Sequence, residues 1–357
     1  MPLAPQDDPK QVRQDIRSLE PEALQAWFEE RGEKAFRARQ VYEWLWQHRA
    51  DSFEQMTNLS KPLRMQLAEA FALCRLEIRQ EQRSGDGTIK YAFGLADGNV
   101  IEGVLIPQGD RMTACVSSQS GCSLSCKFCA TGYLPLKRNL YAYEIVDQVM
   151  LIDEAARRHY GKPLTNIVYM GMGEPLLNYR NVLESIRRIT APEGLGMGAR
   201  RITVSTAGIA KMIRKLGDDG YRSELALSLH AANDQKRSEI MPINETNSLE
   251  ALADALRYFY DKTGTRITLE YVALGGVNDS LQDAEELLAF VRQVPSKVNI
   301  IEYNPIALAD YRASSGNQLY RFKEHLERGG AIVNIRRSRG KDIDAACGQL
   351  AALPPRS

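Results

Sequence analysis

The sequence has no apolar run long enough to span a bilayer, so it predicts no membrane segment. Its first residues, Met1 to Arg13, lack the basic-then-apolar order of an export signal, which favours a cytoplasmic location. An excess of charge is missing too, because 46 basic and 45 acidic residues leave a net charge of +1. A nucleic-acid surface would therefore have to be local rather than a property of the whole chain.

Internal repeats and low-complexity tracts are absent, and histidine is scarce, with four in the chain. There are only six cysteines: Cys74, Cys115, Cys122, Cys126, Cys129 and Cys347. In a reducing compartment, cysteines are more often metal ligands or catalytic groups than members of a disulfide framework. Apart from a tail, "LPPRS", that we expect to be disordered, the composition is that of an ordinary globular protein, 44% apolar and 25% charged.

Two regions differ in their hydrophobic pattern. From Asp15 to Ala72 the apolar positions recur at helical spacing, and Ser60 and Pro62 fit the cap and first turn of one helix. From Cys74 to Pro107 three strand-like segments are joined by "SGDG" and "ADGN", which are hairpin turn signals. We therefore expect an N-terminal helical domain over 1–73 and a β-strand extension over 74–110.

Beyond Arg111 strand-like and helical segments alternate, for example helices over Tyr143–Arg158, Leu249–Thr263 and Gln282–Val294. Such alternation predicts an α/β domain over 111–340, with a parallel sheet that forms a full barrel, a partial barrel or an open sheet. A C-terminal loop and tail, 341–357, follow. In each of these architectures the active site lies at the carboxyl ends of the strands.

The strongest local signal is "GCSLSCKFCATG", which places Cys122, Cys126 and Cys129 at C-x3-C-x2-C spacing. Three thiolates leave one iron of a [4Fe–4S] cube open to another ligand. The alternatives are a zinc site completed by a distant residue and three buried cysteines without metal. The loop resembles that of the radical S-adenosylmethionine superfamily, in which the open iron binds the cofactor. The resemblance implies that Phe128 packs near the adenine of S-adenosylmethionine.

Polar residues and glycines follow several other predicted strands. "MGMGEP" holds Gly171, Gly173 and Glu174, and this segment resembles the superfamily's glycine–glutamate contact to the methionine amino group. We expect the cofactor to be bound by Gly173, Glu174, Ser205, Ser228, Leu229, His230 and Asn304. Read alone, "MGMGEP" fits a plain strand-to-helix turn equally well, and Ser205, Ser228, His230 and Asn304 would each more often be turn or cap residues.

The whole pattern resembles the RlmN family of RNA adenine C2-methyltransferases. The matching segments run from "FRARQVYEWLW" and "MTNLSKPLR" through "CVSSQSGCSLSCKFCATG" and "ALSLHAANDQKRSEIMPIN" to "DIDAACGQL". The resemblance implies a partial (β/α)6 barrel with N-terminal helices that grip RNA. It also implies a [4Fe–4S] cluster and two molecules of S-adenosylmethionine per turnover.

The resemblance further assigns three catalytic residues. Cys347 receives a methyl group, which becomes a radical and adds to carbon 2 of adenine. Glu102 then removes the carbon-2 proton, and Cys115 frees the product as it forms a disulfide with Cys347. Without the resemblance, Glu102 would be read as a strand residue facing solvent, and Cys74, Cys115 and Cys347 as core cysteines.

The implied substrates are 23S ribosomal RNA, near the peptidyl-transferase centre, and transfer RNA beside the anticodon, at position 37. A flavodoxin-type electron donor is implied as well, and we expect a monomer. Candidate phosphate contacts are Arg200, Arg201, Arg336, Arg337, Arg339 and Lys341, for which the alternative is a solvated basic face.

Three other functions stay open. A sister methyltransferase that acts on adenine carbon 8 would use the same cysteines. A radical enzyme that modifies proteins would need neither Cys115 nor Cys347. A zinc–RNA binding module would hold one zinc ion instead of an iron–sulfur cluster.

Overall fold

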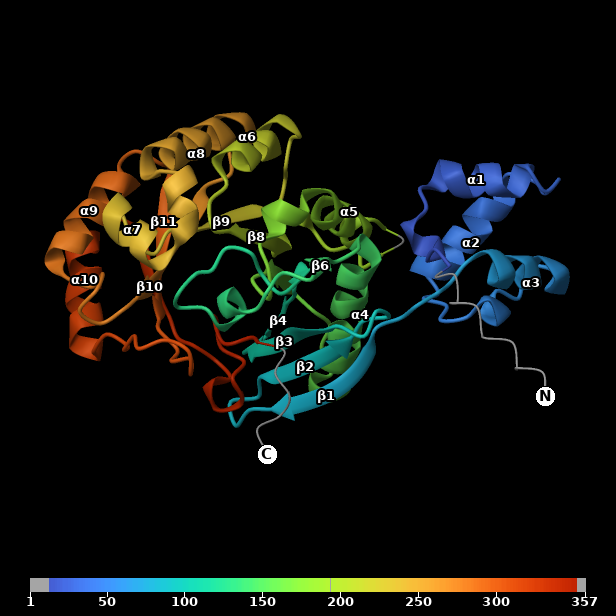
Figure 1. The fold of residues 1–357 in the computed structure, drawn as a ribbon, viewed down its shortest axis with the longest axis horizontal. Helices are drawn as coiled ribbons and strands as arrows, with labels where there is room; N and C mark the ends of the chain where they lie inside the picture. Colours follow the sequence, from blue (N-terminus) through green and yellow to red (C-terminus); the bar gives the residue numbers. More distant parts are fainter. Residues whose placement is uncertain (1–12, 193, 352–357) are drawn as a thin grey trace, which may run out of the picture. The chain divides into compact units, whose positions relative to one another are not determined.

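The computed structural model describes residues 13–192 and 194–351 (Figure 1). The described residues form two compact units: one runs up to Arg75 and includes the loop 191–196, and the other holds the rest. Within these residues no helix combines the length and the apolar character that crossing a bilayer requires. The predictions for the tail "LPPRS" and for the residues before Arg13 lie outside the described part.

The smaller unit is helical, as predicted. Its helices are α1 (Pro21–Glu29), α2 (Phe36–Trp46) and α3 (Lys61–Ala70), with single turns at Ile16–Ser18 and Phe53–Gln55. Its core contains the fully buried Phe28 and Val41. The predicted cap of α3 is confirmed, because the Ser60 hydroxyl accepts a hydrogen bond from the Leu63 N–H and Pro62 lies in the first turn.

The larger unit is built on one sheet with the strand order β1-β2-β3-β4-β7-β8-β9-β10-β11-β12. The strands are β1 (Glu77–Arg83), β2 (Ile89–Gly94), β3 (Val100–Gln108), β4 (Arg111–Cys115), β7 (Asn166–Tyr169), β8 (Ile202–Thr206), β9 (Glu224–Ser228), β10 (Ile267–Ala273), β11 (Ser296–Glu302) and β12 (Val333–Arg336). A two-stranded ribbon joins β5 (Gln119–Ser120) to β6 (Arg138–Asn139). Pairing is antiparallel from β1 to β4 and parallel from β4 to β12.

Helices connect the parallel strands and lie outside the curved sheet (Figure 1). They are α4 (Ala142–Tyr160), α5 (Tyr179–Thr190), α6 (Ala210–Asp218), α7 (Asp234–Ile240), α8 (Leu249–Thr263), α9 (Leu281–Val291) and α10 (Gly316–Arg328). Short 3₁₀ turns are Ala130–Tyr133, Pro175–Asn178, Ala199–Arg201, Pro242–Thr246 and Lys341–Ile343. Strand and helix alternate from β4 to β12, which confirms the predicted α/β fold. The sheet does not close, because β1 and β12 are its two edges, so the domain is a partial barrel.

The hairpin extension explains where Glu102 lies. The turn at Asp97–Gly98 sets a register that pairs Ala92 with Glu102, so Lys90 lies diagonally across from Glu102. Glu102 is 4% exposed and Lys90 is 8% exposed. Reading Glu102 as a solvent-facing strand residue would therefore be wrong, because this face of β3 is covered by protein.

Candidate functional site

The three predicted cluster cysteines line a single cavity, which is open to solvent at the carboxyl ends of the parallel strands. Predicted residues that share this cavity are Cys122, Cys126, Cys129, Phe128, Gly171, Gly173, Glu174, Ser205, Ser228, His230 and Cys347. They come from the loop after β5 and from the ends of β7, β8 and β9, together with the C-terminal loop. The structure thus brings together residues that are more than 200 positions apart in the sequence.

The cysteine loop closes tightly on itself. The Cys129 N–H donates to the Cys126 carbonyl at 3.2 Å, and the Gly132 N–H donates to the Cys129 carbonyl at 2.9 Å. A Cβ atom at Gly132 would lie 2.5 Å from the Cys126 carbonyl oxygen, so this close return needs glycine. The Lys127 N–H donates to the Ile240 carbonyl at 3.0 Å and ties the loop to the barrel.

The donor set fits an iron–sulfur cluster. Burial raises the pKa of Cys122 to about 11, and it raises the pKa of Cys126 and Cys129 as well; neighbouring thiols raise the first two further. Three thiolates that line one cavity need a compensating positive charge, which metal ions supply. Three cysteine ligands leave one iron of a [4Fe–4S] cube open to another ligand. Among the described residues, no three His, Cys, Asp or Glu side chains form a group that would hold one metal ion.

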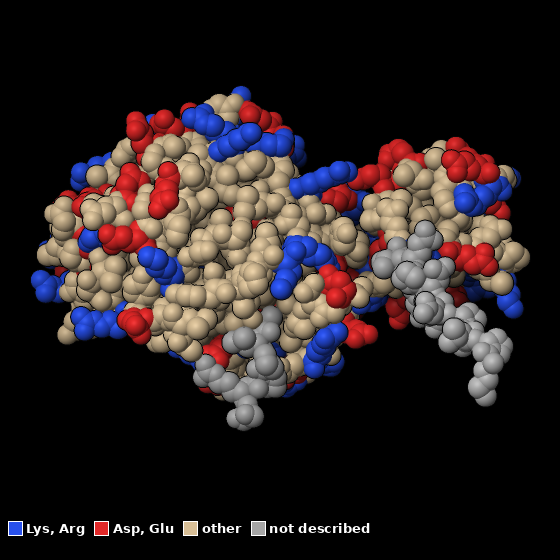
Figure 2. All heavy atoms as spheres, in the orientation of Figure 1, with Lys and Arg blue, Asp and Glu red and all other residues tan. Residues whose placement is uncertain are grey.

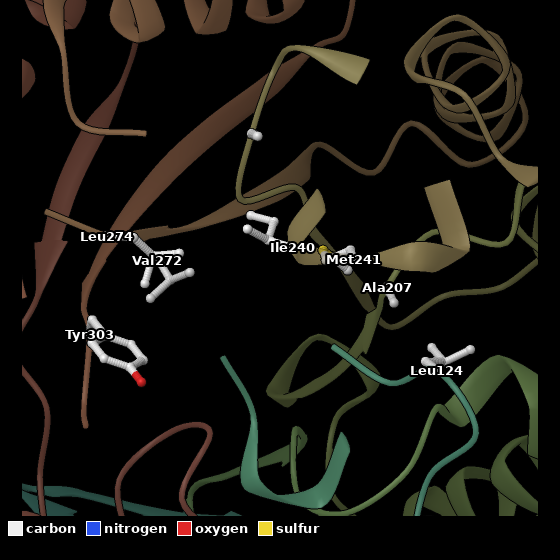
Figure 3. Packing of buried hydrophobic residues seen from close by; sticks show 8 residues of the cluster. Leu124, Ala207, Ile240, Met241, Val272, Leu274 and Tyr303 are labelled. Carbon is white, nitrogen blue, oxygen red and sulfur yellow. The ribbon is translucent and has the colours of Figure 1, made fainter. Parts of the chain in front are cut away.

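An apolar wall stands beside the thiols. Leu124, Ala207, Met241, Val272 and Tyr303 belong to one buried cluster, and all five also line the cavity (Figure 3). Cys122, Cys126 and Phe128 pack against the same cluster. A wall of this kind limits the access of water to the cavity.

The segment after β7 also forms as predicted. Gly173 has φ +93°, and a Cβ there would lie 2.4 Å from the Gln119 side chain, so only glycine fits. Glu174 is buried, and its carboxylate accepts hydrogen bonds from the Leu176 N–H at 2.9 Å and the Ala207 N–H at 2.7 Å. Burial raises the pKa of Glu174, and these backbone donors oppose the rise.

The imidazole of His230 is fixed in one orientation and one protonation state. Its Nδ1 accepts from the Val272 N–H at 3.0 Å, and its ring meets Phe128 edge-on with centroids 4.7 Å apart. Burial, and then the charge of Arg237, lower the pKa of His230 to about 3. The imidazole is therefore neutral at pH 7, with its proton on Nε2.

Arg237 is a residue that the sequence analysis missed. It has no exposed surface and donates to the carbonyls of Leu229 at 2.9 Å, Ser228 at 3.1 Å and Ala207 at 2.6 Å. One buried guanidinium thus fixes the backbone at the ends of β8 and β9. Ser205 and Ser228 lie at these same strand ends, and their hydroxyl oxygens are 3.4 Å apart.

Four predicted residues do not line the cavity. Leu229 is fully buried and contributes through its backbone, with its N–H donating to the Glu270 carbonyl at 3.0 Å. The Nδ2 of Asn304 donates to the Cys347 carbonyl at 3.1 Å, while its buried Oδ1 has no partner among the described residues. Cys115 and Glu102 are buried beside the Cys347 loop.

Cys347 and Cys115 lie near each other and near Arg336. Cys347 is exposed within the cavity, whereas Cys115 is buried at the end of β4. Burial, and then the charge of Cys347, raise the pKa of Cys115 to about 12, and Arg336 opposes this. Desolvation also raises the pKa of Cys347, again against Arg336. Both sulfurs are therefore thiols at pH 7 in this arrangement.

The loop that carries Cys347 is held by the residue predicted to be the base. Glu102 Oε2 accepts from the Ala351 N–H at 2.8 Å, and Glu102 Oε1 lies 3.4 Å from Lys90 Nζ. Lys90 Nζ in turn donates to the Asp344 carbonyl at 3.4 Å. A buried ion pair thus joins the hairpin extension to both ends of the loop.

Lys90→Met is expected to lower the free energy of unfolding by about 3–5 kcal/mol, because it leaves the buried Glu102 carboxylate without its cation. Urea denaturation followed by circular dichroism measures this. The matched control is Lys162→Met, which breaks the exposed Lys162–Asp110 pair and should change stability by less than about 1 kcal/mol. Equal effects of the two substitutions would contradict the pairing.

The predicted phosphate contacts at 336–341 are not a free basic surface. Arg337 and Lys341 each lie 2.9 Å from the Glu302 carboxylate, and Arg339 lies 4.0 Å from Asp86. Arg336 reaches the interior instead. On the face shown in Figure 2, the middle of the larger unit is mostly uncharged, with basic and acidic residues around it. Arg200 and Arg201 are exposed and stay candidates for phosphate contact.

A partial barrel with three thiols at the carboxyl ends of its strands defines a radical S-adenosylmethionine enzyme. Residues 116–291 match the sequence profile of the radical SAM superfamily, and residues 14–73 match that of the ribosomal RNA large subunit methyltransferase N-terminal domain. A radical SAM methyltransferase from Sphaerobacter thermophilus has a similar solved structure, with a TM-score of 0.89 and 42% identity. The match covers 95% of this chain and 100% of that one.

The chain belongs to the RlmN family. It is 62% identical over 336 residues to the probable dual-specificity RNA methyltransferase RlmN of Cytophaga hutchinsonii, covering 94% of this chain and 92% of the relative. It is 46% identical over 354 residues to the dual-specificity RNA methyltransferase RlmN of Anaeromyxobacter sp., covering 98% and 94%. It is thus an enzyme of the methyltransferase class, and its superfamily implies an iron–sulfur cluster and S-adenosylmethionine as cofactors.

Proposed function

We propose that the enzyme methylates carbon 2 of an adenine in 23S ribosomal RNA, near the peptidyl-transferase centre, and in transfer RNA at position 37. The RNA substrates are supported by the names of the relatives. The observation that carries the chemistry is the position of Cys347, which shares one cavity with Cys122, Cys126 and Cys129 and whose charge acts on Cys115. Glu102 holds the same loop through Ala351.

In this proposal Cys122, Cys126 and Cys129 hold the cluster. Gly173, Glu174, Ser205, Ser228, Leu229, His230 and Asn304 bind S-adenosylmethionine. When bound, the cluster and two molecules of S-adenosylmethionine per turnover supply an electron, a methyl group and a 5′-deoxyadenosyl radical. Leu124, Met241 and Val272 belong to the apolar wall and give the cavity a face without polar groups.

The chain's own side chains perform the other steps. Cys347 carries the methyl carbon to adenine, because carbon 2 is electron-poor and does not attack a methyl donor itself. Glu102 accepts the carbon-2 proton. Cys115 then attacks the Cys347 sulfur: the S–S bond forms as the bond between that sulfur and the methylene carbon breaks, and the carbon takes up a proton to become the methyl group of the departing base. The target base must leave its stack to reach these residues.

Other parts of the chain have supporting roles in the proposal. Residues 1–73 bind folded RNA, 74–110 supply Glu102, 111–340 form the barrel, and 341–357 carry Cys347. We infer a monomer in the cytoplasm that receives its electron from a flavodoxin-type donor.

The test is methylation of unmodified ribosomal RNA fragments and of a transfer RNA anticodon stem-loop by anaerobically reconstituted enzyme. Mass spectrometry against synthetic standards should identify 2-methyladenosine in both RNAs. The 8-methyl isomer as sole product would contradict the carbon-2 assignment. Product in ribosomal RNA alone would contradict the dual substrate.

A further inference from the structure

A buried carboxylate of the cavity has an oxygen without a partner. Glu270, in the middle of β10, is 4% exposed and lines the cavity. Its Oε1 accepts from Asn299 Nδ2 at 3.0 Å, but its buried Oε2 has no hydrogen-bond partner among the described residues. Burial raises the pKa of Glu270, and Arg336 opposes the rise. An acceptor buried this way is costly unless a ligand supplies the donor.

A cation acts on this carboxylate from beyond ion-pair distance. Arg336 ends β12, directly across from Ile301 of β11, which lines the cavity. Its Nη1 lies 3.6 Å from the sulfur of Met170, a weak acceptor that also lines the cavity. Burial lowers the pKa of Arg336, but the charges of Cys347, Glu270 and Cys115 outweigh this and raise it. The described residues give Arg336 no carboxylate within ion-pair distance, so the guanidinium keeps donors for a ligand.

We propose that Glu270 and Arg336 bind the Watson–Crick edge of the target adenine. Glu270 Oε2 accepts from the exocyclic amino group, and Arg336 donates to the neighbouring ring nitrogen N1. This inference rests on the proposed function, since it deepens the recognition of that same adenine.

Two features of the base support this assignment. Adenine presents a donor and an acceptor side by side on that edge, which matches an open acceptor beside a guanidinium. Carbon 2 is bonded to N1, so a base whose N1 accepts from Arg336 holds carbon 2 next to that contact, in the cavity that Cys347 also lines. The same pair disfavours guanine, which presents a carbonyl to Glu270 and an N–H to Arg336.

The adenine of S-adenosylmethionine carries the same edge, so the test must separate the two sources. The probe is an RNA fragment whose target adenosine is replaced by purine riboside, which lacks only the amino group. Single-turnover methylation by the wild type should be about 10- to 100-fold slower on the purine fragment than on the adenosine fragment. Glu270→Ala should methylate both fragments at the slow rate, with less than about threefold between them. Removing the amino group also changes the reactivity of the ring itself. This change affects the wild type and Glu270→Ala alike, so it cancels when the adenosine-to-purine rate ratios of the two enzymes are compared.

Two further variants complete the design. Glu270→Gln keeps an acceptor oxygen and should retain a preference for adenosine of about tenfold or more. Glu250→Ala, which removes an exposed glutamate in the first turn of α8, should behave as the wild type. Iron content and affinity for S-adenosylmethionine should stay within about threefold of the wild type in all variants.

Two results would overturn the inference. One is a ratio of methylation rates, adenosine fragment to purine fragment, that is the same in Glu270→Ala as in the wild type. The other is loss of affinity for S-adenosylmethionine in both Glu270→Ala and Glu270→Gln, which would assign the carboxylate to the cofactor. A wild-type enzyme that methylates neither fragment would instead overturn the proposed function.

Discussion

Cys126→Ala is expected to reduce RNA methylation to background. Cys126 is the middle thiol of the loop, it lines the cavity, and its neighbours Cys122 and Cys129 cannot hold a four-iron cube alone. Anaerobically reconstituted wild type should carry about four irons per chain with the brown colour of a cluster, and the variant less than about one. Iron and sulfide analysis with absorption spectroscopy measures this independently of activity.

The control for this experiment is Cys74→Ala. Cys74 belongs to the smaller unit, where its backbone N–H donates to Asp15 and its backbone carbonyl accepts from Arg17. This variant should keep its cluster and its activity. One colourless zinc ion per chain in the wild type would contradict the cluster and favour the zinc–RNA binding module.

Most of the fold could be predicted because its signals are local. The Asp97–Gly98 turn fixes the hairpin, the Ser60 hydroxyl caps α3, and the predicted helix over Leu249–Thr263 matches α8 to the residue. Cys122, Cys126 and Cys129 are close in sequence, so their shared cavity follows from one loop. The ends of the other predicted helices differ by a few residues, as frayed termini do.

Long-range contacts were harder to predict. The contacts of Arg237, Glu270 and Arg336 join strands that are far apart in sequence. From the sequence alone, a basic residue in "RRSRGK" is expected at the surface. In the structure, pairing of β12 with β11 brings Arg336 next to Met170, which lines the cavity. Lys90 is an exception. The Asp97–Gly98 turn alone sets the register that brings Lys90 diagonal to Glu102, so the sequence contained a signal that the analysis did not use.

Cys115→Ala is expected to trap a covalent adduct between the protein and RNA. Cys115 lies close enough to Cys347 for the charge of Cys347 to raise the pKa of Cys115, and the charges of both cysteines raise the pKa of Arg336. In the proposed reaction Cys347 remains bonded to carbon 2 of adenine until a second thiol attacks its sulfur. The other cysteines of the barrel loop, Cys122, Cys126 and Cys129, hold the cluster in this reaction and are therefore not free to replace Cys115.

Denaturing gel electrophoresis should show the adduct as RNA that migrates with the protein, and peptide mapping should place it on Cys347. Cys347→Ala and the double variant Cys115→Ala/Cys347→Ala should form neither adduct nor product, while both keep their iron. A small external thiol attacks as its thiolate, so in Cys115→Ala it should release the trapped RNA faster as the pH rises towards the pKa of the added thiol. If Cys115→Ala turns over at the wild-type rate without added thiol, Cys347 is freed in another way. If Cys347→Ala forms methylated RNA, Cys347 is not the methyl carrier.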